Sequence, residues 1–221
     1  MNNKYVFRQK SIVRNCDKAY KDYKSYKPYL KKDFHERCAY CNLRSDQITT
    51  YFEIDHFVPR KQFEKAKLNY LETDYKNLVY ACRKCNNAKS DSFSGDLTIN
   101  PYENKEFYDP VKTDYNLIFY RDEIGRIQSE DELGKQMIDV LKLYRPIHSL
   151  PWIIEQLEKA IEKINEKRKT SNNDCNKLDE AYIRLLEWKD DLKTLFIKNY
   201  NNNDFSYNID VSVKDINMLL D

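Results

Sequence analysis

The stretch YFEIDHFVPR, residues 51–60, decides how this chain is interpreted. Alternating aromatic and apolar residues predict a short, half-buried strand over 51–58, which Pro59 ends because proline cannot continue a hydrogen-bonded ladder. Asp55 and His56 stand side by side near the end of this strand, although the chain has only 3 histidines. Neighbouring strand residues point to opposite faces, so we expect the strand to end or bulge at this pair.

Two Cys-x-x-Cys pairs flank that strand, Cys38 and Cys41 in CAYC and Cys82 and Cys85 in CRKC. Two residues between thiolates let both sulfurs approach one tetrahedral ion at about 2.3 Å. In a reducing compartment, a double pair of this kind predicts a structural zinc site and no disulfide. The pairs are separated by 40 residues, more than the ~15–20 of a simple zinc ribbon. We therefore expect the zinc to close a long insertion that contains residues 51–60.

The residues between and just after the cysteine pairs resemble the HNH endonuclease family. The resemblance rests on the Asp-His pair at a strand end, on Asn77 in NLVYAC, and on CNNAKSD after the second cysteine pair, and covers roughly residues 38–92. It implies an α+β, ββα-metal fold in which two strands and a helix, expected to begin near Asn86, hold one divalent cation. Weaker similarity, in NPYENKEFYDP and GKQMIDVLKLYR, extends to bacterial HNH proteins with a helical C-terminal extension, several of which act in anti-phage defence.

Four residues are the candidate catalytic set. His56 suits a general base, because an unperturbed imidazole titrates near pH ~6.5, and Asp55 offers a hard oxygen ligand for Mg²⁺ or Mn²⁺. The resemblance implies that Asn86 supplies the second ligand, where the family often has histidine, and that Asn77 fixes the loop carrying the base. An amide oxygen in place of imidazole favours Mg²⁺ over softer metals. The alternative for Asn77 is a simple turn-forming role.

Charge along the chain points to a polyanionic partner. Residues 1–95 hold 20 Lys or Arg against 11 Asp or Glu, whereas the remainder holds 18 against 25. A basic front half is typical of nucleic-acid binding, although chance clustering on solvated faces gives the same balance. The candidate phosphate contacts are Arg60, Lys61, Arg83, Lys84 and Lys89. The alternative for each is a solvated surface charge. Glu53 shares the strand face of Asp55 and either orients a ligand or pairs with a lysine.

The chain is expected to contain three consecutive segments. Residues 1–37 form a basic, tyrosine-rich helical segment, 38–95 the HNH core with its zinc, and 96–221 a loop, a short hairpin and a helical region. In the first segment tyrosines recur every third residue from Tyr20 to Tyr29. They either pack into the core or stack on nucleic-acid bases.

In the last segment we expect a hairpin turning at Gly125 and then three helices. The first helix is expected over about 132–144, and the second from a Ser149 N-cap to about 168, with Pro151 in its first turn. The third follows TSNND, with apolar residues at Leu178, Ala181, Leu185, Trp188, Leu192 and Leu195. The last two helices are expected to form an antiparallel pair that packs on itself or docks a partner, such as an ATPase of a defence complex.

These features predict a metal-dependent HNH endonuclease that hydrolyses phosphodiester bonds in nucleic acid. The resemblance favours DNA as substrate, Mg²⁺ or Mn²⁺ as the catalytic ion and Zn²⁺ as the structural one, and an anti-phage defence role. The alternative is a non-catalytic zinc-stabilised module that only binds nucleic acid, or a partner subunit. No run of about 20 apolar residues and no apolar signal-peptide core occurs, so a cytoplasmic location is expected.

Overall fold

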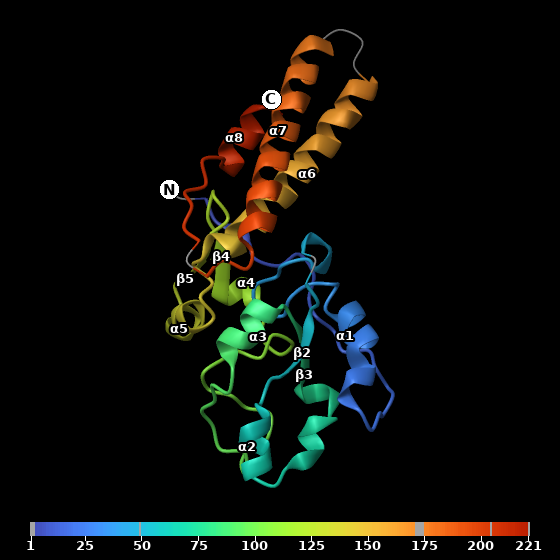
Figure 1. Ribbon diagram of the computed structural model, residues 1–221, viewed down its shortest axis with the longest axis vertical. Helices are drawn as coiled ribbons and strands as arrows, with labels where there is room; N and C mark the ends of the chain where they lie inside the picture. Colours follow the sequence, from blue (N-terminus) through green and yellow to red (C-terminus); the bar gives the residue numbers. More distant parts are fainter. Residues whose placement is uncertain (1–2, 49, 171–174, 204, 221) are drawn as a thin grey trace. The chain divides into compact units, whose positions relative to one another are not determined.

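The computed structural model describes residues 3–48, 50–170, 175–203 and 205–220 (Figure 1). Its strands are β1 Tyr5–Val6, β2 Glu53–His56, β3 Leu78–Ala81, β4 Phe119–Arg121 and β5 Ile127–Ser129. Its α-helices are α1 Lys27–Asp33, α2 Arg60–Lys65, α3 Arg83–Lys89, α4 Tyr115–Ile118, α5 Glu132–Val140, α6 Pro146–Thr170, α7 Cys175–Asn199 and α8 Val213–Met218. Short 3-10 helices are η1 Tyr23–Tyr26, η2 Ser45–Gln47, η3 Asn69–Glu72 and η4 Tyr75–Asn77. The expected α+β class is confirmed.

The chain divides into two compact units. The first unit consists of Met1–Tyr5, Arg121–Ile127 and Tyr144–Asp221, and the second of Val6–Tyr120 and Gln128–Leu143. The second unit contains both cysteine pairs and every candidate catalytic residue. The boundary expected near residue 95 falls inside this second unit.

Strands β2 and β3 form the antiparallel pair at the centre of the second unit. Their register pairs Glu53 with Ala81, and Asp55 with Val79. The connection between them carries α2, η3 and η4, and every residue of β3 is buried. In Figure 1 helix α3 lies on one side of this strand pair and α1 on the other. Two strands and α3 give the ββα arrangement that the sequence predicts.

Helix α3 begins earlier than the sequence suggested. Cys82 has extended backbone angles, φ −71° and ψ 150°, and caps a helix whose first residue is Arg83. The prediction of a start near Asn86 was therefore wrong by one turn. Because the helix starts at the second cysteine pair, Cys85 and Asn86 both project from it, one toward the cysteine cluster and one toward β2.

The strand that carries the Asp-His pair ends at His56 and has a regular register up to that point. The sequence left open whether the strand ends or bulges here, and in the structure it ends. Pro59 follows as the N-cap of α2. The end of the strand places the last side chain, His56, at the edge of the sheet.

The tyrosine-rich segment is helical only from Tyr23 onward, and Pro28 lies in the first turn of α1. Tyr26 is 3% exposed and its ring packs 5.0 Å from that of Tyr75. Of the two roles considered for these tyrosines, core packing and base stacking, Tyr26 has the first. Tyr23 is only half-buried and lies next to the candidate site described below.

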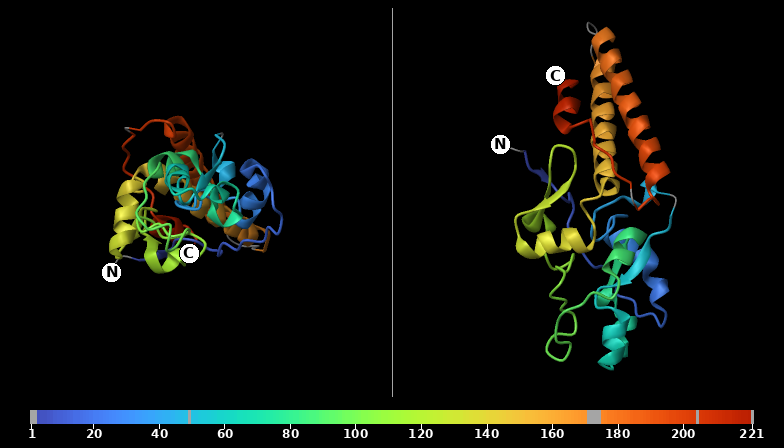
Figure 2. Two further views of the ribbon diagram at one scale, coloured as in Figure 1. Left: turned by 90° about the horizontal axis from the view of Figure 1, so that it is seen from below. Right: turned by 60° about the vertical axis from the view of Figure 1, so that its left-hand side comes forward.

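The first unit contains the long helices α6 and α7, which run side by side (Figure 2). The expected helical pair is confirmed, with Ile153, Leu157, Ala160 and Ile164 of α6 and Ala181, Leu185 and Leu192 of α7 buried. Phe196, at 1% exposure, takes the core position expected for the half-buried Leu195.

Two expected helix boundaries in this part of the chain, the start of α6 and the end of α5, differ from the structure. Helix α6 begins at Pro146, so Ser149 lies inside it as a buried residue and not at its N-cap, and Pro151 lies inside the helix. Helix α5 ends at Val140, before the expected 144.

The expected hairpin is confirmed: β4 and β5 are adjacent strands, and Gly125 adopts the left-handed φ of 80° at their turn. Among the described residues, no helix is both long enough and apolar enough to span a membrane.

Candidate active site and metal centre

The four paired cysteines come together in one buried cluster. The sulfur atoms of Cys38, Cys41, Cys82 and Cys85 all lie within 4.8 Å of one another, and each residue is at most 1% exposed. The two sulfurs of Cys41 and Cys82 are 3.8 Å apart. A tetrahedron with Zn–S bonds of about 2.3 Å has edges of about 3.8 Å. The donor set and its spacing therefore fit a closed, structural Zn²⁺ site.

Backbone geometry around the first pair forms a tight knuckle. Cys38 N–H donates to the Leu43 carbonyl over 2.9 Å, and Ala39 N–H donates to Tyr80 O on β3 over 2.8 Å. Asn42 adopts a left-handed φ of 63° to turn the chain. The knuckle is thereby tied to the same strand that leads into the second cysteine pair.

Asp55 is a buried carboxylate, 6% exposed, with two side-chain partners. Tyr40 donates its hydroxyl to Oδ2 over 2.5 Å, and Lys89 Nζ lies 3.1 Å from Oδ1. Burial and the neighbouring Asp55 charge raise the pKa of Tyr40 well above its usual value, so it stays a neutral donor. Lys89 also donates to the backbone carbonyl of His56 over 3.0 Å. One lysine thus orders both members of the Asp-His pair.

His56 is oriented by a backbone acceptor. Its Nε2 lies 2.9 Å from the Glu72 carbonyl oxygen, which can only accept, so Nε2 carries the proton and Nδ1 keeps the basic lone pair. The ring packs 4.9 Å from that of Tyr23 and 5.7 Å from that of Phe63, centroid to centroid. Burial lowers the pKa of His56, which favours the neutral imidazole that proton abstraction requires.

Asn77 ties together the loops on either side of His56. Its Oδ1 accepts from Val58 N–H over 2.8 Å, and its Nδ2 donates to the carbonyls of Val58 and Leu71 over 3.2 and 3.1 Å. The residue is 1% exposed. The segment from Leu71 also supplies the carbonyl of Glu72. This arrangement fits the positioning role expected for Asn77.

Asn86 projects from α3 toward the Asp55 face of β2. Its Nδ2 donates to Glu53 Oε2 over 2.6 Å, and Glu53 also pairs with Arg83 at 3.7 Å. Because the amide nitrogen is used, its Oδ1 remains as an acceptor for a cation. Glu53 thus orients a candidate ligand, one of the two roles that the sequence left open.

An open groove of about 490 Å³ lies at the end of β2. Its lining contains Asp55, His56 and Asn86 together with residues of the α2 start and of the segment after α3, namely Ile54, Pro59, Arg60, Lys61, Ser90 and Asp91. The structure therefore brings three of the four candidate catalytic residues to one surface. A carboxylate and an amide oxygen fit Mg²⁺, which binds one or two protein oxygens and completes its shell with water and phosphate oxygens.

The candidate phosphate contacts are divided between surface and interior. The side chains of Arg60, Lys61 and Arg83 are 46%, 76% and 64% exposed, and their carboxylate partners are Glu72, Asp91 and Glu53. Lys84 is half-buried. Lys89, by contrast, is 0% exposed. The sequence offered two interpretations of Lys89, a phosphate contact or a solvated charge. Neither fits this interior position.

Sequence reasoning missed the roles of four residues that shape the site, although Lys89 was a candidate phosphate contact and Tyr23 belonged to the tyrosine series. Tyr40 and Lys89 hold Asp55, while Tyr23 and the Glu72 carbonyl hold His56. The spacing of Lys89, four residues after Cys85, was the available signal, since both then lie on one helix face. The contacts of Tyr23 and Glu72 cross 16 residues or more of sequence and left no local pattern.

Comparison with known proteins agrees with this geometry. Residues 38–92 match the family described as HNH endonuclease. The chain is 27% identical over 168 residues to Septu protein PtuB of Bacillus thuringiensis, covering 72% of this chain and 60% of the relative. It is 32% identical over 83 residues to Septu protein PtuB of Bacillus mycoides, covering 34% of this chain and 28% of that relative.

A third similarity links the chain to a differently named protein. It is 26% identical over 134 residues to Septu protein PtuA of Bacillus mycoides, covering 53% of this chain and 19% of the relative. In each case the match spans less than two thirds of the relative's length. No solved structure matches the chain. The cysteine cluster, the ββα arrangement and the match together identify residues 38–92 as a domain of the HNH endonuclease family.

Proposed function

We propose that this protein is a metal-dependent endonuclease that hydrolyses phosphodiester bonds, with DNA as its substrate. The observation that carries the proposal is the convergence of Asp55, His56 and Asn86 on one open groove. Two of these residues offer oxygen ligands and the third offers a neutral imidazole held in a defined tautomer. Four thiolates would complete the coordination of a zinc ion in the cysteine cluster, so this ion would supply stability and not chemistry.

His56 acts as the general base in this proposal. Its Nδ1 takes a proton from the water that attacks phosphorus, while Nε2 keeps its hydrogen bond to the Glu72 carbonyl. The bond from phosphorus to the departing 3′ oxygen breaks, and that oxygen gains a proton from solvent. Asp55 and Asn86 would hold a Mg²⁺-type ion, which supplies Lewis-acid stabilisation of the charge that develops on the phosphate.

The positions of the surface cations support binding of a strand along the groove. Arg60 and Lys61 line it, and Arg83 lies at the first turn of α3. Asp91 is exposed and Glu72 is half-buried, so a phosphate can replace these partners of Lys61 and Arg60 at small cost, whereas Glu53 also holds Asn86. Mutating one such cation is expected to weaken binding without changing the identity of the bond that is cut.

The experiment that tests this function compares cleavage of duplex DNA, single-stranded DNA and RNA with increasing Mg²⁺ or Mn²⁺. We expect duplex DNA to be cut, and Asp55→Asn or Asn86→Ala to raise the metal concentration needed for half-maximal rate. The rival, a zinc-stabilised binding module, predicts retained zinc, nucleic-acid binding and no effect of the second ion. Preferential cleavage of RNA would support the nuclease assignment but exclude DNA as the preferred substrate.

We further infer a role in anti-phage defence together with a protein partner. Similarity to proteins named Septu PtuB and Septu PtuA supports the defence role. Helix α7 supports the partner: Ile183 and Ile197 are 54% and 52% exposed, and their separation of 14 residues places them close to one face. Charged substitutions at both positions are expected to abolish co-purification with this partner, an ATPase by our expectation, while DNA cleavage is unchanged.

A further inference from the structure

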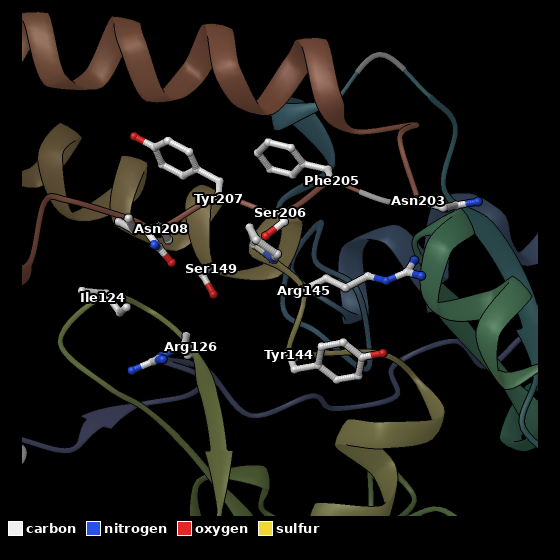
Figure 3. A pocket seen from close by; sticks show the side chains of 12 residues that line it. Ile124, Arg126, Tyr144, Arg145, Ser149, Asn203, Phe205, Ser206, Tyr207 and Asn208 are labelled. Carbon is white, nitrogen blue, oxygen red and sulfur yellow. The ribbon is translucent and has the colours of Figure 1, made fainter.

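The first unit contains a cavity of about 620 Å³ that none of the HNH residues lines (Figure 3). Three segments form its walls: the turn between β4 and β5, the residues that lead into α6, and the segment after α7. Its size lies in the range of about 300–1,000 Å³ that is usual for small-molecule sites. The described lining residues are Ile124, Arg126, Tyr144, Arg145, Pro146, Ser149, Asn203, Phe205, Ser206, Tyr207, Asn208 and Ile209.

Hydrogen bonds inside this unit fix the walls relative to each other. Arg121 donates from one guanidinium nitrogen to the carbonyls of Gly125 and His148, over 2.6 and 2.7 Å. This joins the hairpin turn to the first turns of α6. Val213 N–H donates to Glu123 O over 2.9 Å and joins the C-terminal segment to the same turn. The cavity is therefore preformed and does not depend on a ligand to bring its walls together.

Aromatic rings line two sides of the cavity. Phe205 and Tyr207 are two residues apart in extended chain, and their rings are almost parallel, with an interplanar angle of 8° and centroids 6.2 Å apart. Figure 3 shows both rings facing the same way above the cavity, with the ring of Tyr144 below it. Tyr144 is 56% exposed. Flat rings presented in this way form a stacking surface for planar groups, such as nucleobases.

The charged groups of the lining are all positive. Arg126 and Arg145 line the cavity and no carboxylate does. Arg126 pairs through Nε with Asp122 at 2.8 Å, so its terminal amino groups can still donate to a ligand. The Arg145 guanidinium makes no hydrogen bond or ion pair with any described residue. Arg145 directly precedes α6, a 25-residue helix whose N-terminal end favours anions. A phosphate group matches this end of the cavity.

An unpaired buried hydroxyl also marks the cavity. Ser149 is 1% exposed, and its Oγ has no hydrogen-bond partner. In Figure 3 this oxygen points into the open space between the aromatic rings and the hairpin turn. A buried polar group without a partner costs stability unless a bound molecule satisfies it. This observation is independent of the aromatic and charged lining, and it points to the same ligand space.

We propose that this cavity is a nucleotide-binding site, in which Phe205 and Tyr207 stack on the base, Arg145 and the α6 N-terminus hold phosphate, and Ser149 bonds a polar group of the ligand. The nucleotide is either a free mononucleotide or one residue of a single strand, because both offer a planar base next to a phosphate. The site goes beyond the proposed nuclease function, since it uses none of the catalytic residues.

The test uses residues 1–221 with zinc bound and no added Mg²⁺. AMP is titrated by calorimetry, and fluorescein-labelled (dT)8 is titrated by fluorescence anisotropy. Arg145→Gln and the pair Phe205→Ala with Tyr207→Ala are each expected to weaken binding by about tenfold or more. Arg184→Gln, at an exposed α7 residue of the same unit, is the matched control for Arg145→Gln and is expected to bind as the wild type does.

Ser149→Ala separates ligand binding from folding. Removing an unpaired hydroxyl leaves the thermal midpoint unchanged or higher, whereas it weakens binding if Ser149 contacts the ligand. Photocrosslinking gives a second readout. A 4-thiouridine probe is expected to label the tryptic peptide 199–214, which contains both Phe205 and Tyr207.

The outcomes are distinct. Pocket-dependent binding of AMP identifies a free nucleotide as the ligand, and pocket-dependent binding of (dT)8 alone identifies a single strand. The proposal is overturned if neither probe binds, if the pocket variants bind as the wild type does, or if inorganic phosphate at equal concentration displaces the probe, since an anion site alone needs no base.

Discussion

Lys89 Nζ lies 3.1 Å from Asp55 Oδ1, and both side chains are buried, with exposures of 0% and 6%. The lysine also donates to the His56 carbonyl. An ion pair of this kind costs desolvation energy to form, so its presence calls for a reason other than stability. Here it fixes the Asp55 carboxylate and the His56 backbone in one arrangement.

Removing Lys89 is expected to destabilise the protein far more than removing an exposed lysine. Lys89→Met leaves a buried carboxylate without its counter-charge, and we expect a loss of about 3–5 kcal/mol in the free energy of unfolding. The control is Lys61→Met, which breaks an exposed pair with Asp91 that is shorter, at 2.7 Å. Urea unfolding measures both. Equal midpoints for the two variants would contradict the buried pairing.

Loss of zinc is expected to unfold the HNH domain. The ion would join two knuckles separated by 40 residues, and binding at structural zinc sites is worth about 10–16 kcal/mol. Cys85→Ser should therefore lose zinc and the cooperative unfolding transition of this domain. Cys16→Ser should keep both, because Cys16 is outside the cluster. Elemental analysis and circular dichroism are the measurements; one zinc per chain is expected for wild type.

Asn77 is expected to matter for catalysis more than its stability cost explains. Asn77→Ala leaves buried backbone groups of Val58 and Leu71 unpaired, at about 1–3 kcal/mol for each such group. The control is Asn104→Ala, which removes a buried amide that bonds the backbone of Ser94 and Ser92. We expect the two variants to lose comparable stability.

Only Asn77→Ala should lower kcat when both variants are assayed well below their melting temperatures. DNA binding should remain in both. A matching fall in kcat for Asn104→Ala would show that reduced stability alone accounts for the loss of activity.

Arg8 is expected to tune zinc affinity. Arg8 is 8% exposed. Its guanidinium donates to Ala39 O over 2.5 Å and to Pro110 O over 3.2 Å, and it lies 4.7 Å from the Tyr115 ring centroid. No described carboxylate forms an ion pair with it. A zinc ion with four thiolates carries two net negative charges, which makes the cluster the natural counter-charge for this arginine.

Arg8→Met should therefore weaken zinc binding by about 10–100-fold, as measured by competition with a chromogenic chelator. Arg14→Met is the control, because Arg14 also donates to backbone carbonyls, those of Tyr75 and Leu78, away from the cysteines. An identical zinc affinity in the Arg8 variant would remove the electrostatic link between this side chain and the cluster.

The zinc cluster and the ββα core could be predicted from the sequence, because both depend on short spacings between residues. Two residues between cysteines, alternation along β2 and the Asp-His pair are local patterns that geometry constrains tightly. Helix ends were less predictable. Ser149 looked like an N-cap, yet α6 begins at Pro146, since packing of Ile147 and Leu150 into the core extends the helix past the local signal.

The contacts that orient the site lay beyond sequence reasoning. A lysine is rarely buried, so its ordinary surface preference argued against the position that Lys89 takes. The Glu72 carbonyl acts through its backbone, which has no residue signature at all. The ring of Tyr23 reaches His56 from a segment 33 residues away, so only tertiary structure brings the two together.

The measurement that tests the central claim most directly is nicking of supercoiled plasmid by wild type and His56→Ala in Mg²⁺ or Mn²⁺. His35→Gln, at an exposed histidine of the same unit, serves as a control, and zinc content is checked in all three proteins. We expect wild type and the control to convert the plasmid to open circle or linear form, while His56→Ala leaves it supercoiled with its zinc retained. Cleavage by zinc-loaded His56→Ala at the wild-type rate would contradict the assignment of His56 as the base.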